Sequence, residues 1–121
     1  QVFVKDLGTG QVTLASADAD GNARGGFNPA ISPDGHYVSF TSNASDLVAG
    51  STSSGENVFV KDLWSGEVKQ LSDNTASIIN RYGAGQERSV VTDTGAVAFS
   101  SLTSNLVPGD TNSVFNIFLS T

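Results

Sequence analysis

The sequence predicts an all-β protein, and three observations support this class. Ser and Thr together account for 27 of the 121 residues and Gly for 13, a composition typical of short strands joined by tight turns. Blocks of sequence recur with a period near 56 residues. No stretch shows a sustained apolar period of about 3.6 residues, so we expect no long helix.

The repeat is clearest in one hexapeptide. Val-Phe-Val-Lys-Asp-Leu occupies residues 2–7 and recurs at residues 58–63, and a truncated copy, Ile-Phe-Leu, follows at residues 117–119. Two further blocks agree at nearly the same period, residues 30–40 with 90–99 and residues 46–52 with 105–111. The chain is therefore divided into a first repeat that starts mid-unit, a second repeat and the start of a third, at residues 1–57, 58–116 and 117–121.

Each unit reads as four short strands. The first complete unit predicts strands at residues 27–31, 37–41, 58–63 and 67–71. Pro33, Asp34 and Gly35 mark the tight turn between the first two, because Pro presets φ and Gly accepts a positive φ. In the partial unit before it, we expect strands at residues 2–7 and 11–15.

Four strands in a period of about 50 to 60 residues are typical of a β-propeller blade. We therefore expect blades that are four-stranded antiparallel sheets, present as two units plus a truncated third. A single blade has two faces that both need covering, so it does not stand alone. The repeat places five rings in two equivalent sets that we expect to be buried between sheets: Phe40 with Phe99, and Phe3 with Phe59 and Phe118.

The composition excludes several classes of protein. With 6 Lys and Arg against 12 Asp and Glu, the net charge of −6 argues against a nucleic-acid partner. The absence of Cys excludes disulfides, thiolate metal sites and a cysteine nucleophile. No run approaches the roughly 18 apolar residues of a membrane span. The chain opens at Gln1 without a signal segment, from which we expect a processed product or an excised piece.

Two phrases carry a family resemblance. Asn-Pro-Ala-Ile-Ser-Pro-Asp-Gly-His-Tyr-Val-Ser-Phe, at residues 28–40, resembles the SPDG-type blade of TolB-like and WD40-like bacterial β-propellers. Ser-Asn-Leu-Val-Pro-Gly-Asp-Thr-Asn, at residues 104–112, followed by Asn-Ile-Phe, looks like a secreted, calcium-associated subgroup of them. The resemblance covers essentially the whole chain. It implies a repeat scaffold that is secreted, periplasmic or on the cell surface, and it implies no particular reaction.

The chain departs from that family pattern in its loops and in one turn. The final Asp of the family's acidic loop is replaced by Asn57 in one copy and by Asn116 in the other. The first copy also has Ser51 and Ser53 where the second has Asp110 and Asn112. The turn at Asp-Thr-Gly, residues 93–95, lacks the Pro of its counterpart.

Two acidic loops are candidate calcium sites, because Ca²⁺ prefers carboxylate, amide and carbonyl oxygens. The first is formed by Asp110, Asn112 and Asn116, with one carboxylate. The alternative is that Asp110 and Asn112 bond to their own loop as Asx-turns. In the equivalent loop of the first copy, Ser51, Ser53 and Asn57 supply no carboxylate, so a metal is not expected there.

The second candidate loop reads Asp18-Ala-Asp20-Gly-Asn22, the spacing that opens an EF-hand-like loop. It lacks the bidentate Glu that follows six or seven residues later in such loops; Gly26, Phe27 and Asn28 stand in that region instead. The alternative is a solvated connection between blades.

Catalysis is not expected. His36 is the sole His, and we expect it at a solvated strand position. No G-x-S-x-G elbow accompanies it, and the chain cannot assemble a zinc site from several His. We therefore predict that the chain is not an enzyme and hydrolyses no peptide, ester or glycoside.

Two features belong to the hairpin after the third strand of each unit. The Asp at its start, Asp6 or Asp62, is expected to brace the turn that follows. Trp64 stands at the turn where the other copy has Gly8. A Trp at a hairpin tip can stack on a sugar ring, or it can pack against a neighbouring part of the chain.

The function predicted from these features is an extracytoplasmic β-propeller segment that serves as a structural or binding scaffold, stabilised by calcium. Its expected partners are neighbouring blades or copies of itself, with a protein or glycan as ligand. One alternative is the accessory propeller of a secreted hydrolase or peptidase. Another is a self-assembling surface subunit joined by strand addition at open sheet edges.

Overall fold

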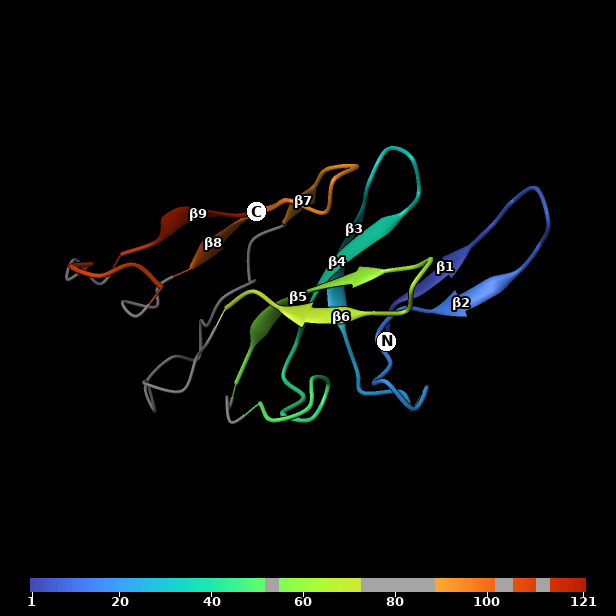
Figure 1. Ribbon diagram of the computed structural model, residues 1–121, viewed down its shortest axis with the longest axis horizontal. Coiled ribbons are helices and arrows are strands. Elements are labelled where there is room, and N and C mark those ends of the chain that lie inside the picture. The colour runs from blue at the N-terminus through green and yellow to red at the C-terminus, as the bar shows by residue number, and fades with distance from the viewer. Residues whose placement is uncertain (52–54, 73–88, 102–105, 111–113) are drawn as a thin grey trace.

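The computed structural model describes residues 1–51, 55–72, 89–101, 106–110 and 114–121. These residues form nine strands in three antiparallel sheets and contain no helix (Figure 1). The all-β class predicted from the sequence is confirmed. Among the described residues there is no helix long and apolar enough to cross a membrane.

The central sheet has four strands in sequence order, β3 (Phe27–Ile31), β4 (Tyr37–Ser42), β5 (Asn57–Asp62) and β6 (Val68–Gln70). All four lie where the sequence predicts them, with ends that differ by at most one residue. The β4–β5 pairing is the longest and runs from Tyr37 opposite Asp62 to Ser42 opposite Asn57. A register shift between Phe27 and Ala30 interrupts the β3–β4 pairing, and Asn28 there has a φ of 49°.

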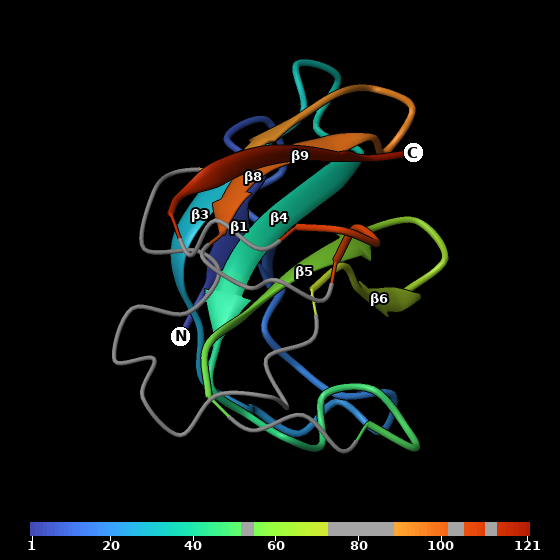
Figure 2. The same cartoon turned by 90° about the vertical axis from the view of Figure 1, so that its left-hand side faces the viewer.

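A smaller sheet flanks the central one on each side. On one side is the hairpin of β1 (Phe3–Lys5) and β2 (Val12–Leu14). On the other is a three-stranded sheet of β7 (Val90–Val91), β8 (Val97–Ser101) and β9 (Asn116–Ser120). Figure 2, seen from the side of β9, places β8 and β9 in front of β3 and β4, with β1 behind them.

Two apolar clusters hold the three sheets together. The first joins the β1–β2 hairpin to one face of the central sheet and contains Val2, Ala15, Val38, Phe40, Leu47 and Phe59. The second joins the other face to the three-stranded sheet and contains Val58, Val60, Val91, Val97 and Phe99. Because neighbouring residues of β5 point to opposite faces, Phe59 enters the first cluster and Val58 and Val60 enter the second.

One glycine sets how closely the central and three-stranded sheets approach. Gly95 lies in the turn between β7 and β8 with a φ of 78°. A Cβ at this position would lie 3.0 Å from the ring of Tyr37, so only Gly fits here without strain. At the same rim, the backbone N–H of Asp34 donates to Oδ1 of Asp93 at 3.0 Å.

Of the five rings expected to be equivalent and buried, Phe40, Phe59 and Phe99 are buried and Phe118 is half-buried against the second cluster. The expectation for Phe3 is wrong, since this residue is 58% exposed. Val2 and Val4 turn toward the central sheet, so alternation directs Phe3 to the opposite face of the hairpin. No described residues cover that face. The blade organisation itself stays a prediction.

Candidate functional site

The hairpin turns are built as the sequence predicts, each around one carboxylate. Oδ1 of Asp62 accepts the backbone N–H groups of Trp64 and Ser65 at 2.8 and 2.9 Å. Oδ1 of Asp6 accepts those of Gly8 and Thr9 at 2.7 and 3.1 Å. These N–H groups, Ser65 first for Asp62 and Thr9 first for Asp6, lower the pKa of each Asp. The expectation that this Asp braces its turn is confirmed.

An aromatic stack distinguishes the second of these turns. The imidazole of His36 lies 3.6 Å from the indole of Trp64, nearly parallel at 16°, and 4.0 Å from the ring of Tyr37. Nε2 of His36 lies 3.0 Å from Oδ1 of Asp62. The expectation that His36 is solvated is wrong, because its side chain is only 14% exposed under this stack.

Trp64 itself is 74% exposed. One side of the indole packs against another part of the chain, which is one of the two interpretations from sequence. The other interpretation, contact with a glycan, remains a prediction. The pairing of Trp64 with His36 was not predicted. The available signal was that the chain's sole Trp and sole His both stand where the other repeat copy has no counterpart of their kind.

The loop of Asp18, Asp20 and Asn22 folds around the first of these carboxylates. Oδ1 of Asp18 accepts the backbone N–H groups of Asp20 and Asn22 at 3.0 and 2.9 Å. Oδ2 pairs with the guanidinium of Arg24 at 2.6 Å, and Arg24 also lies 3.3 Å from Asp46. The N–H of Asn22 and the Arg24 charge lower the pKa of Asp18. A calcium ion bound here would have to displace the Arg24 guanidinium from this carboxylate.

In the other candidate loop, Nδ2 of Asn116 donates to Oδ2 of Asp110 at 3.0 Å. The same amide donates to the backbone carbonyl of Val114 at 3.2 Å. These contacts place Asn116 beside the single carboxylate of the loop, with its amide nitrogen toward that carboxylate, and the calcium site stays a prediction. Asn112 lies outside the described residues. No group of three or more acidic or His side chains converges within the described part of the chain.

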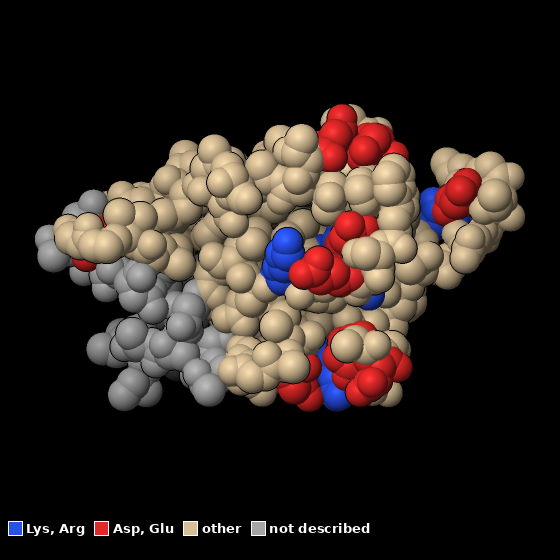
Figure 3. All heavy atoms as spheres, viewed as in Figure 1, with Lys and Arg blue, Asp and Glu red and all other residues tan. Residues whose placement is uncertain are grey.

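The surfaces at the two ends of the molecule are rich in exposed apolar side chains. We call the outer face of the β1–β2 hairpin the N-terminal end face; it carries Phe3 and Val12. We call the outer face of the three-stranded sheet the C-terminal end face; it carries Val90, Ile117 and Leu119. In the side view of Figure 3 most acidic and basic side chains lie over β1–β6 and the turns, and only a small acidic patch is visible at the end that carries β8 and β9.

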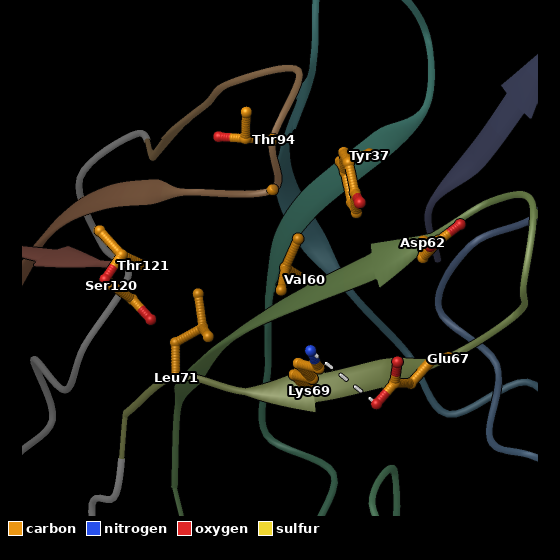
Figure 4. Close-up of a pocket in the computed structure, with 10 residues that line it drawn as sticks. Tyr37, Val60, Asp62, Glu67, Lys69, Leu71, Thr94, Ser120 and Thr121 are labelled. Carbon is orange, nitrogen blue, oxygen red and sulfur yellow. Dashed lines mark ion pairs between the residues drawn. The ribbon is translucent and has the colours of Figure 1, made fainter.

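A groove runs beside β9, which pairs with β8 alone among the described strands. One part of it, about 380 Å³, is lined mainly by apolar residues that include Leu71, Leu106 and Phe118. The adjoining part, about 200 Å³, is more polar and lies between the central sheet and the end of β9. Figure 4 shows this second part, with Leu71 and Val60 on one side and Ser120 and Thr121 on the other. The groove and the C-terminal end face are the surfaces best suited to contact another polypeptide.

Comparison of the sequence with known protein families and with curated proteins finds no match.

Proposed function

We propose that this chain is a segment of a propeller-type repeat scaffold, acting as a structural or binding module whose end faces receive neighbouring repeats. One observation carries the proposal. Ile117 and Leu119 of β9 are 83% and 67% exposed, whereas their repeat equivalents Val58 and Val60 in β5 are buried under the adjacent sheet.

The central sheet provides the reference for what each face requires. It is covered by apolar clusters on both faces, and each cluster is made by a flanking sheet. The flanking sheets repeat its sequence and are covered on one face only within the described residues. Large exposed apolar patches mark interaction surfaces, so a further sheet on each end face is the arrangement that the repeat favours.

The setting and chemistry of the scaffold follow from the same features. The resemblance to secreted bacterial propellers supports a location outside the cytoplasm, with calcium held at the Asp110 loop as a stabilising ion. We propose no catalytic role for the chain. Its sole His lies 3.0 Å from Asp62, stacks on Trp64 and contacts the ring of Tyr37, an arrangement that fixes a turn.

Light scattering over a range of protein concentrations tests the proposal. We expect the mass of the chain in solution to rise with concentration, because the apolar end faces associate. Ile117→Thr, which makes the C-terminal end face polar and keeps a β-branched residue, should lower this association. Ile31→Thr is the matched control, because Ile31 is 51% exposed in β3 of the central sheet and so belongs to neither end face.

Two results would contradict the proposal. One is a constant monomer mass for the parent chain up to the highest concentration. The other is equal association of the parent and the Ile117→Thr variant.

A further inference from the structure

A serine side chain hydrogen-bonds the last strand of a complete unit to the strand before it. In the central sheet, Oγ of Ser72 accepts the backbone N–H of Val58 at 2.9 Å, and the N–H of Leu71 donates to the Val58 carbonyl at 2.8 Å. Ser72 thereby closes the pairing of β6 with β5 from beyond the end of β6. We call this pair of bonds the serine clasp.

The first hairpin has the same clasp. Oγ of Ser16 accepts the backbone N–H of Val2 at 2.9 Å, and the N–H of Ala15 donates to the Val2 carbonyl at 2.8 Å. The registers also agree, since Phe3 faces Leu14 as Phe59 faces Gln70. The segments that supply the clasp read Val-Thr-Leu-Ala-Ser at residues 12–16 and Val-Lys-Gln-Leu-Ser at residues 68–72. Their shared pattern is Val-x-x-Ala/Leu-Ser.

In the three-stranded sheet, β9 has the groups that accept a clasp in the other two sheets. Ile117 in β9 is the repeat equivalent of Val2 and Val58. In the central sheet Oδ1 of Asn57 accepts the Ser72 hydroxyl at 3.0 Å, while its Nδ2 donates to the Gly55 carbonyl at 3.2 Å. The Asn equivalent to Asn57, Asn116, makes the matching Nδ2 bond to Val114, also at 3.2 Å.

The outer edge of β9 therefore has three features suited to a clasp. The Asn116 side-chain amide is oriented as in Asn57, β9 is equivalent to β5, and a groove lies beside it. No strand in the described residues pairs with this edge. We propose that the edge binds an extended peptide segment of the pattern Val-x-x-Ala/Leu-Ser by antiparallel strand addition. This proposal rests on the proposed scaffold function and names the partner of its C-terminal end.

The register of the bound segment follows from β5 and β6. The Val of the segment lies opposite Ser120, and its third residue after the Val reaches the Ile117 carbonyl with its N–H. The Ser then accepts the Ile117 N–H, as Ser72 accepts that of Val58. Strand addition of this kind takes its affinity from main-chain bonds and its specificity from alternate side chains.

A synthetic peptide of residues 66–72 with blocked ends is the probe, and amide NMR of the isotope-labelled chain is the readout. We expect saturable shifts and slowed exchange at the backbone amides of Ile117, Leu119 and Thr121, the residues that face the open edge. The peptide variant Ser72→Ala should bind roughly tenfold more weakly, because it loses the hydroxyl that accepts the Ile117 N–H and keeps only the main-chain bond of the clasp. The peptide variant Lys69→Thr is the control and should bind equally, because the first hairpin has Thr13 there.

A chain variant tests the edge directly. Leu119→Pro removes an N–H that faces the groove and leaves the β8–β9 bonds, which use the alternate residues, so it should abolish peptide binding. Leu119→Thr keeps the N–H and should retain it. Equal binding of the Ser72→Ala peptide, shifts that avoid β9, or unchanged binding by the Leu119→Pro chain would each overturn the proposal.

The two proposals fail in different ways. The scaffold proposal depends on the apolar side chains of the end face, whereas the clasp depends on main-chain groups at the edge. Association that is lowered by Ile117→Thr, with no Ser-dependent peptide binding, would overturn the clasp alone. Self-association that the peptide leaves unchanged while it occupies β9 shows that copies meet through their faces, and supports both proposals.

Discussion

At the residue scale, Phe40 and Phe59 form the centre of the first apolar cluster. Their rings are fully buried and lie 5.8 Å apart on adjacent strands. Phe3 has the same place in the repeat as Phe59, yet its ring is mostly exposed. The same residue type in the same local sequence therefore contributes very differently to stability, depending on whether a sheet lies against it.

This difference can be measured in a matched pair of variants. Phe59→Ala should lower the free energy of unfolding by about 3–5 kcal/mol, because it leaves a cavity under the β1–β2 hairpin. Phe3→Ala should change it by about 0.5 kcal/mol or less, as is usual at exposed positions. Chemical denaturation followed by circular dichroism gives both values. Comparable losses in the two variants would show that the N-terminal end face is covered in solution.

The turn carboxylates make stability depend on pH. Backbone N–H groups, that of Ser65 foremost, hold the pKa of Asp62 below its ordinary value of 3.8. A group with a lowered folded-state pKa stabilises the fold above its unfolded pKa, and this contribution is lost as the pH falls through the folded value. We expect the unfolding free energy to decline as the pH falls below about 4. Asp62→Asn should reduce this dependence, measured by denaturant unfolding between pH 7 and pH 2, and an unchanged slope would contradict it.

At the scale of elements, the two hairpins show how a repeat diverges without changing its fold. Both turns are closed by an Asp that accepts two backbone N–H groups. One of them has Gly8 at the tip, and the other has Trp64 stacked on His36. The turn of the second hairpin is thereby tied to the β3–β4 turn, a contact between elements that are far apart in sequence.

The acidic loops are elements whose role a melting experiment can assign. With its single carboxylate, the Asp110 loop should bind calcium in the extracellular range, with a dissociation constant of about 10⁻⁴–10⁻³ M. Free calcium at tenfold over that constant would stabilise the fold by about 1.4 kcal/mol. We expect millimolar Ca²⁺ to raise the melting temperature of the parent relative to chelator, and Asp110→Ala to remove the shift.

The pattern of results separates the loops. An equal calcium shift in the parent and in Asp110→Ala would place the ion elsewhere, with the Asp18–Asp20 loop as the next candidate. No shift in either protein would show that both loops are ordinary turns. In the Asp18–Asp20 loop, Arg24 and the backbone N–H of Asn22 already occupy the Asp18 carboxylate.

At the scale of the whole molecule, the chain is a stack of three sheets joined by two apolar clusters. Each cluster lies between sheets, so no sheet holds a core of its own. The stability of such an assembly is the sum of terms within units and terms between neighbours. Within the described residues, the end faces and the outer edge of β9 are the surfaces that lack the stabilising term from a neighbouring sheet or strand.

The sequence by itself determined the strands and turns, because alternation, turn residues and the repeated hexapeptide are local signals. It also predicted the bracing role of Asp6 and Asp62, since an Asx-turn involves residues within three positions of each other. Only the tertiary structure decided that Phe3 is exposed, that His36 lies under Trp64 and that β9, beside a groove, pairs with β8 alone among the described strands. The physical reason is that burial, stacking and edge pairing depend on which sheet lies opposite a residue, and a repeat unit carries the same local signals whether or not that neighbour is present.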